Sequence, residues 1–322
     1  MTCPRCPARA LLSILWVALA CSDGATNPER PPEPVYRAEE VRFASDGLML
    51  EGTLLVPTGA AAAPAIVIVA GSGPVNRDGI YLPAPNLLPP IYRRWAERMA
   101  SEKMVVLRYD KRFITHRAID PLALSQEDQV SDIVAAVSYL ERRPEVDAQR
   151  IFVVGHSEGA SIAPVAASRA SVRAVVGAAA LAFAVDSLVL AQLRASPDVP
   201  PSAVAEAEQA FRQLREGTLP AGSNILGAGP AYWREWIRFT ERADSIALAL
   251  GRPMLVVQGL ADENFPGSTL EKNVRLWEAI ASRSPLVELR TYPGVTHDLL
   301  SRATQGDGGA VVTDIIEWLR TR

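Results

Sequence analysis

Three apolar runs, each followed by a segment with helical spacing, most strongly constrain the fold. They are AIVIVAG (65–71), MVVLRYD (104–110) and IFVVG (151–155). A continuous apolar run of this length is typical of a strand buried on both faces of a parallel sheet. Because such strands alternate with helical segments, we predict an α/β fold with a mostly parallel central sheet flanked by helices.

The rest of the chain after residue 41 continues the alternation of predicted strands and helices, with one interruption. Around Ser45-Asp46-Gly47 a turn signal separates two apolar runs and predicts a hairpin. From about 183 to 250 the alternation stops, and helical spacing with aromatic residues predicts a helical lid inserted over the sheet. The aromatic side chains there fit the core of the lid or, alternatively, an acyl-binding wall. Further strands are expected at 173–180, 253–259 and 285–292, with helices at 91–103, 128–143, 160–170, 269–282 and 310–321.

Composition fits a packed globular enzyme. Of the 322 residues 48% are apolar and 21% charged, and the net charge is −3. A chain of this length suits one large domain or a domain with an insertion. Because basic residues are not concentrated anywhere, no nucleic-acid partner is expected.

The N-terminal segment resembles a targeting sequence. Residues 1–20 contain two arginines and then an apolar run too short to span a bilayer, which is typical of a signal peptide. Cys21 follows Ala20 directly, as in a bacterial lipoprotein signal. We therefore expect an exported protein, anchored to a membrane through a lipidated Cys21 and facing the periplasm or the cell exterior. Ordinary secretion and an uncleaved anchor are the alternatives.

Residues 21–40 are polar and proline-rich and predict a semi-stiff tether between the anchor and a folded α/β domain at 41–322. All three cysteines lie in the first 21 residues. The CxxC spacing of Cys3 and Cys6 is interpreted as part of the leader, because no second cysteine pair follows. A processed chain would then have no intramolecular disulfide.

GHSEG (155–159) lies between a predicted buried strand and a predicted helix. That setting is the one required by a Gly-x-Ser-x-Gly nucleophile elbow, whose sharp turn exposes the serine hydroxyl at the top of a sheet. Gly155 and Gly159 remove side chains that would collide inside the turn. We predict Ser157 as the nucleophile. The alternative is an ordinary loop between a strand and a helix.

A serine nucleophile needs a base and an orienting acid. Of the three histidines only His297 follows a late strand, whereas His116 precedes the elbow and His156 adjoins Ser157. Asp262 comes three residues after the strand that ends at 259, so the chain order is Ser157, Asp262, His297. The alternatives are that Asp262 caps the next helix and that His297 is a buried polar residue. Glu263 is the less favoured acid.

Four local motifs together carry a family resemblance: AGSGPVNRDG (70–79), RYDKR (108–112), GHSEGASIAPVAA (155–167) and YPGVTHDLL (292–300). From about Val41 onward the chain resembles the α/β-hydrolase superfamily, and within it bacterial esterases of the dienelactone-hydrolase or acyl-peptidase type. The chain departs from that group at Ala160 and Phe113, where glycines are common. The second departure concerns the shape of the loop after RYDKR.

The resemblance also implies an oxyanion hole. The backbone N–H of Glu158, the residue after the nucleophile, would be one donor. The family pattern places the second donor on the backbone N–H of Ser72, with that of Gly73 as an alternative. If residues 71–74 form only a simple turn, this segment supplies no oxyanion donor. The expected activity is hydrolysis of carboxylic esters with a short or medium acyl chain, with a small-molecule ester as the partner and with no metal or cofactor. Peptidase, lactonase, thioesterase and acyl-transferase activities share the same triad, and a non-catalytic, lipid-anchored binding protein is the alternative outside the enzymes. The sequence does not indicate an oligomeric state.

Overall fold

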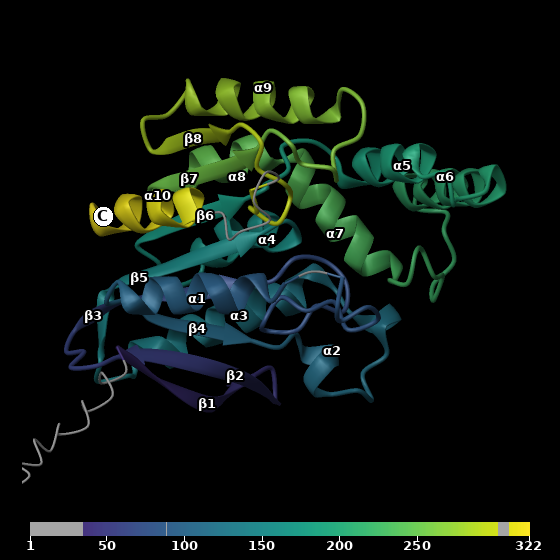
Figure 1. The fold of residues 1–322 in the computed structure, drawn as a ribbon. Coiled ribbons are helices and arrows are strands. Elements are labelled where there is room, and N and C mark those ends of the chain that lie inside the picture. The colour runs from purple at the N-terminus through teal and green to yellow at the C-terminus, as the bar shows by residue number, and fades with distance from the viewer. Residues whose placement is uncertain (1–34, 88, 302–308) are drawn as a thin grey trace, which may run out of the picture. The chain divides into compact units, whose positions relative to one another are not determined.

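One sheet of eight strands organises the described part of the chain, in the order β1-β2-β4-β3-β5-β6-β7-β8 (Figure 1). This computed structural model describes residues 35–87, 89–301 and 309–322. The expected leader, Cys21 and the tether up to residue 34 lie outside the described residues and stay predictions. The strands are β1 (Tyr36–Ser45), β2 (Leu48–Pro57), β3 (Ala63–Val69), β4 (Val105–Tyr109), β5 (Val146–His156), β6 (Ala174–Ala178), β7 (Met254–Gly259) and β8 (Val287–Tyr292).

The sheet is parallel from β4 to β8, and β2 pairs antiparallel with both β1 and β4. Alternate side chains of the central strands enter two separate cores. Along β3, Val67 and Val69 join one core, whereas Ile66 and Ile68 join the other. Burial on both faces explains why these strands are continuously apolar in the sequence.

Helices cover both faces of the sheet. On one face lie α3 (Gln126–Glu141), α4 (Glu158–Ala167), α8 (Ala243–Ala249) and α9 (Thr269–Ala281). On the other face lie α1 (Ile91–Ser101) and α10 (Gly309–Arg320). Trp95 of α1 is 2% exposed, and burial of such a side chain contributes roughly 1.5–3 kcal/mol. The predicted α/β class, with helices on both sides of a mostly parallel sheet, is confirmed.

The first strand begins earlier than the sequence predicted, inside the segment expected to be a tether. β1 begins at Tyr36 and pairs with β2 from Tyr36↔Pro57 onward, so residues 36–40 belong to the sheet and not to the tether. The physical reason is local: the prolines end at Pro34, and every later backbone N–H of this segment is free to join the ladder. The turn lies at Asp46-Gly47, where both residues have positive φ, as a tight hairpin turn requires.

A helical insertion separates β6 from β7, as predicted for about 183–250. It contains α5 (Val185–Ala195), α6 (Pro201–Glu216), α7 (Pro230–Glu241) and α8. Figure 1 shows α5 and α6 at the right, beyond the strands, with α7 between them and α4. The insertion has its own core, in which Phe211, Trp233 and Trp236 stack or meet edge to face. Of the described helices, none combines the length and the hydropathy that crossing a bilayer requires.

Two short elements complete the described chain, α2 (Arg112–Thr115) and the 3-10 turn η1 (Pro121–Ala123). Both follow β4 at the carboxyl end of the parallel strands. The sequence pattern did not indicate them, because four or three residues are too few to show helical spacing.

Candidate active site

Ser157 occupies the sharp turn between β5 and α4. Its backbone has φ 55° and ψ −115°, a region that a non-glycine residue adopts only at a cost of roughly 1–3 kcal/mol. The Ser157 N–H donates to the carbonyl of Ala178 at the end of β6, at 2.8 Å. The turn is therefore anchored to the neighbouring strand, which holds the strained residue in place.

The two glycines of GHSEG are required by close contacts. A Cβ atom on Gly155 would lie 2.3 Å from the carbonyl oxygen of Gly159. A Cβ atom on Gly159 would lie 2.5 Å from the carbonyl oxygen of Val69, the last residue of β3. The elbow thus packs directly on the carboxyl end of β3, and the collisions predicted from the motif are present.

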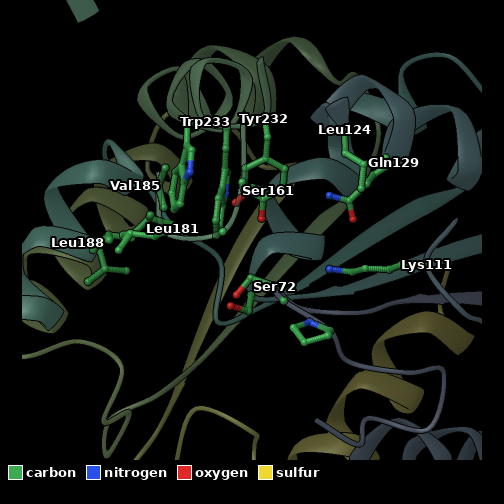
Figure 2. A pocket seen from close by; sticks show the side chains of 18 of the residues that line it. Ser72, Lys111, Leu124, Gln129, Ser161, Leu181, Val185, Leu188, Tyr232 and Trp233 are labelled. Carbon is green, nitrogen blue, oxygen red and sulfur yellow. The ribbon is translucent and has the colours of Figure 1, made fainter. Parts of the chain in front are cut away.

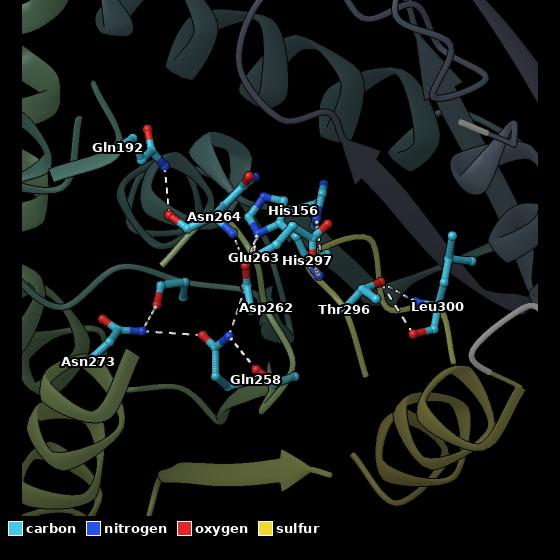
Figure 3. A network of polar contacts seen from close by, with 12 residues as sticks. His156, Gln192, Gln258, Asp262, Glu263, Asn264, Asn273, Thr296, His297 and Leu300 are labelled. Carbon is cyan, nitrogen blue, oxygen red and sulfur yellow. Dashed lines mark hydrogen bonds and ion pairs between the residues drawn. The ribbon is translucent and has the colours of Figure 1, made fainter. Parts of the chain in front are cut away.

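Asp262 and His297 are in contact, although they are far apart in the sequence (Figure 3). The Nδ1 atom of His297 lies 3.0 Å from each carboxylate oxygen of Asp262. Gln258 Nε2 donates to Oδ2 of the same carboxylate at 2.9 Å, and the Asn264 N–H donates to Oδ1 at 3.0 Å. Because a carboxylate only accepts, Nδ1 carries the proton, and in the neutral ring Nε2 keeps its lone pair.

Close packing between two loops brings these side chains together. The turn after β7 hydrogen-bonds to the loop after β8, with the Ala261 N–H donating to the carbonyl of Val295 at 2.9 Å. A Cβ atom on Gly259 would lie 2.3 Å from that same carbonyl oxygen. Gly259 therefore permits the approach that places the Asp262 turn against the His297 loop.

The surroundings of His297 favour its protonated form. Burial opposes that form, but the hydrogen bond and charge of Asp262 and the charges of Asp298 and Glu263 outweigh it and raise the pKa of His297 above its usual value. Asp298 is the residue that follows His297. It is only 8% exposed, and burial raises the pKa of its carboxyl.

A cavity of about 680 Å³ opens beside the elbow, and Ser157, His297 and Ser72 all line it. Figure 2 shows aliphatic side chains and Trp233 at one end and Lys111 and Gln129 at the other. The apolar end is formed mainly by the insertion and includes Leu181, Val185, Leu188, Trp233, Trp236 and Phe265. Trp233 and Trp236 therefore belong both to the core of the insertion and to the cavity wall.

The expected oxyanion donors, Ser72 and Glu158, belong to segments next to Ser157. Glu158 is the first residue of α4, where backbone N–H groups have no partner within the helix. Gly71, just before Ser72, approaches so closely that a Cβ atom on it would lie 3.3 Å from the Cβ of Ser157. Both donors thus belong to backbone segments in contact with the elbow.

His156 is not part of the cavity lining and belongs to a buried chain of hydrogen bonds. The Gly71 N–H donates to the Tyr92 hydroxyl at 2.8 Å, and that hydroxyl lies 2.9 Å from Nδ1 of His156. His156 Nε2 lies 3.0 Å from the carbonyl oxygen of His297. Burial and the nearby His297 lower the pKa of His156 to about 3, so the ring is neutral and links the Gly71 loop with the His297 loop.

Sequence reasoning missed Lys111 and the side chain of Glu158. Lys111 Nζ lies 2.7 Å from Oε2 of Glu158, and both side chains are buried. A signal was present, because Lys111 lies two residues beyond the end of the buried strand β4, at the edge of the sheet where the parallel strands have their carboxyl ends. Among the described residues no group of three or more His, Cys, Asp or Glu side chains is arranged to hold a metal ion.

Comparison with known proteins agrees with the fold. Residues 50–195 match the dienelactone hydrolase family. The chain is 31% identical over 254 residues to the esterase EstD of Thermotoga maritima, across 78% of this chain and 58% of EstD. Among solved structures, the Pyrobaculum calidifontis esterase has a TM-score of 0.58 at 16% identity, covering 89% of this chain and 86% of its own.

The chain therefore has the α/β-hydrolase fold. The same fold occurs in the Pyrococcus horikoshii acylaminoacyl peptidase, at a TM-score of 0.59 and 16% identity, covering 90% of this chain and 42% of the peptidase. The chain spans 58% of the length of EstD, so the comparison covers only part of that relative.

Proposed function

We propose that this α/β-hydrolase is a serine esterase that cleaves small carboxylic esters through an acyl-enzyme intermediate. One observation carries the proposal: a histidine held by a buried carboxylate and a strained serine line the same cavity. The family match and the similarity to EstD support ester hydrolysis. The roles of the individual residues are part of the proposal.

The chemistry follows from the groups at the cavity. Ser157 Oγ attacks the ester carbonyl while His297 Nε2 takes its proton. Asp262 holds the ring in the required tautomer and stabilises the imidazolium that forms. The N–H groups of Ser72 and Glu158 stabilise the tetrahedral oxyanion. His297 then gives the proton to the departing alcohol, and water releases the acyl group by the same steps.

The cavity supports a short or medium acyl chain. Its apolar end, formed by the insertion, offers aliphatic and indole surface. Burial of apolar surface contributes about 25 cal/mol per Å², so each added methylene should improve binding until the cavity is filled. A volume of about 680 Å³ sets that limit. We therefore propose that the insertion acts as the lid that encloses the acyl group.

A series of p-nitrophenyl esters from acetate to dodecanoate tests the proposal. We expect kcat/KM to rise with chain length, pass through a maximum and fall once the chain exceeds the cavity. Trp233→Ala should move the maximum to longer chains, because it enlarges the apolar end. Anilide, thioester and lactone analogues measured beside the esters separate the related activities. Equal slow rates for wild type and Ser157→Ala on every ester would contradict the proposal.

Activity should decline at acid pH because the base must be neutral. Asp262 and its acidic neighbours raise the pKa of His297, so protonation begins above the usual imidazole value of about 6.5. We expect the acid limb of the kcat/KM profile to have its midpoint above that value. The profile is measured on a neutral ester in buffers of constant ionic strength. A rate that is flat down to about pH 4 would exclude His297 as the base.

A further inference from the structure

Lys111 makes two contacts that the mechanism above does not use. Its Nζ atom lies 2.7 Å from Oε2 of Glu158 and 2.5 Å from the carbonyl oxygen of Gly71. The Lys111 side chain is 8% exposed and that of Glu158 is fully buried. One buried ammonium therefore joins the two backbone segments that carry the expected oxyanion donors.

The contact with Gly71 acts on the peptide group that contains the Ser72 N–H. In a trans peptide the carbonyl of one residue and the N–H of the next point in opposite directions within one plane. The ammonium at the Gly71 oxygen therefore directs the Ser72 N–H away from Lys111. A cation at the carbonyl also polarises the peptide and makes its N–H a stronger donor.

The position of this loop is fixed independently by a second side chain. The Gly71 N–H donates to the Tyr92 hydroxyl at 2.8 Å. Tyr92 thus holds the peptide before Gly71, and Lys111 holds the peptide after it. The remaining freedom, rotation of the Gly71-Ser72 peptide plane, is the one that Lys111 restricts.

Glu158 secures the ammonium from the other side. Gln126 Nε2 donates to its Oε1 at 2.7 Å, and the Tyr232 hydroxyl of α7 donates to the same oxygen. Burial opposes ionisation of Glu158, but Lys111 and these hydrogen bonds outweigh it and hold the pKa of Glu158 below its usual value. The carboxylate stays charged and keeps Lys111 in place.

Stability alone does not account for such a pair. Removing two charges from water is costly, and neutral replacements of similar volume are often equally stable or more stable. The buried pair is therefore weak evidence for a purely stabilising role.

We propose that Lys111 is a positioning residue of the oxyanion hole, which orients and polarises the Gly71-Ser72 peptide while Glu158 holds its ammonium. This inference rests on the proposed esterase function. Lys111 also lines the cavity, so direct contact with the substrate is the competing role that the experiment must separate.

The decisive variant is the double replacement Lys111→Met with Glu158→Gln, which removes both charges and leaves no unpaired ion. We expect a melting temperature close to that of the wild type, an unchanged KM and a kcat lower by about 10- to 100-fold, below the cost of losing a whole donor. Binding of an alkyl trifluoromethyl ketone, which forms a tetrahedral adduct with Ser157, should weaken by the same factor. Glu158→Gln alone keeps the contact with Gly71 and should lose less activity.

Rescue provides a second readout. Lys111→Gln with Glu158→Gln restores a donor near the Gly71 carbonyl, and we expect it to recover part of the lost kcat. Equal kcat in the Met and Gln variants would contradict the proposal, as would wild-type kcat and ketone affinity in a folded Met variant. A higher KM at unchanged kcat would identify Lys111 as a substrate contact instead. If wild type and Ser157→Ala are equally slow, the esterase proposal itself fails.

Discussion

Replacing Ser157 with alanine should lower kcat/KM for the best p-nitrophenyl ester by about 10⁴-fold or more. The variant keeps the elbow, the cavity and the Asp262–His297 contact, but it has no hydroxyl to attack the ester. The residual rate would come from binding and from the oxyanion donors. Initial rates with purified protein, and the loss of covalent labelling by a fluorophosphonate, measure the effect.

Ser161 offers a matched control for Ser157. It lies one turn further along α4, lines the same cavity and is 9% exposed, and its hydroxyl has no hydrogen-bond partner among the described residues. Ser161→Ala should therefore leave kcat within a few-fold of the wild type. Labelling should be found on Ser157 in both the wild type and the Ser161→Ala variant. Comparable losses in the two alanine variants would mean that the cavity, and not the hydroxyl of Ser157, limits the rate.

Replacing His297 with glutamine should be nearly as damaging, with a loss of about 10⁴-fold or more in kcat. Glutamine keeps an amide near Asp262 but cannot accept and return a proton. Because Ser157 and His297 act as a unit, the double variant Ser157→Ala with His297→Gln should be no slower than either single variant. Single-turnover acylation and steady-state kcat, measured on all three, test this non-additivity.

His116→Gln is the corresponding control for the base. The His116 ring lies 2.8 Å from the carbonyl oxygen of Met49 and is outside the cavity lining. We expect wild-type rates and an unchanged acid limb of the pH profile. If His297→Gln retained more than about a tenth of the wild-type kcat, His297 would not be the base, since general-base catalysis contributes at least about 10²-fold.

Most of the fold could be predicted because its strands are buried on both faces. Runs such as AIVIVAG are short and have no polar positions, and they alternate with helical segments, so they predicted strands of a parallel sheet. The start of β1 was missed because its burial alternates only weakly before Val41. A half-exposed edge strand beside a proline-rich segment has no comparable signal.

The parts of the candidate site that lie in local sequence motifs could be predicted. GHSEG and its flanking elements specified the elbow, and chain order selected Asp262 and His297. Lys111, Tyr92 and His156 were not assigned roles, because each acts through a partner from a distant element. Their contacts with Gly71, Glu158 and His297 join residues 21 to 141 positions apart in the sequence.

The sequence by itself determined the α/β class, the elbow at Ser157 and the order of the candidate acid and base, since hydrophobic periodicity and glycine placement are local properties. Only the tertiary structure decided which polar groups are buried together: the Lys111–Glu158 pair, the chain from Gly71 through Tyr92 to His156, and the apolar wall from the insertion. The reason is physical. The burial and the charge partners of a side chain depend on which strands have their ends side by side at one edge of the sheet. Those strand ends are neighbours only in the folded chain.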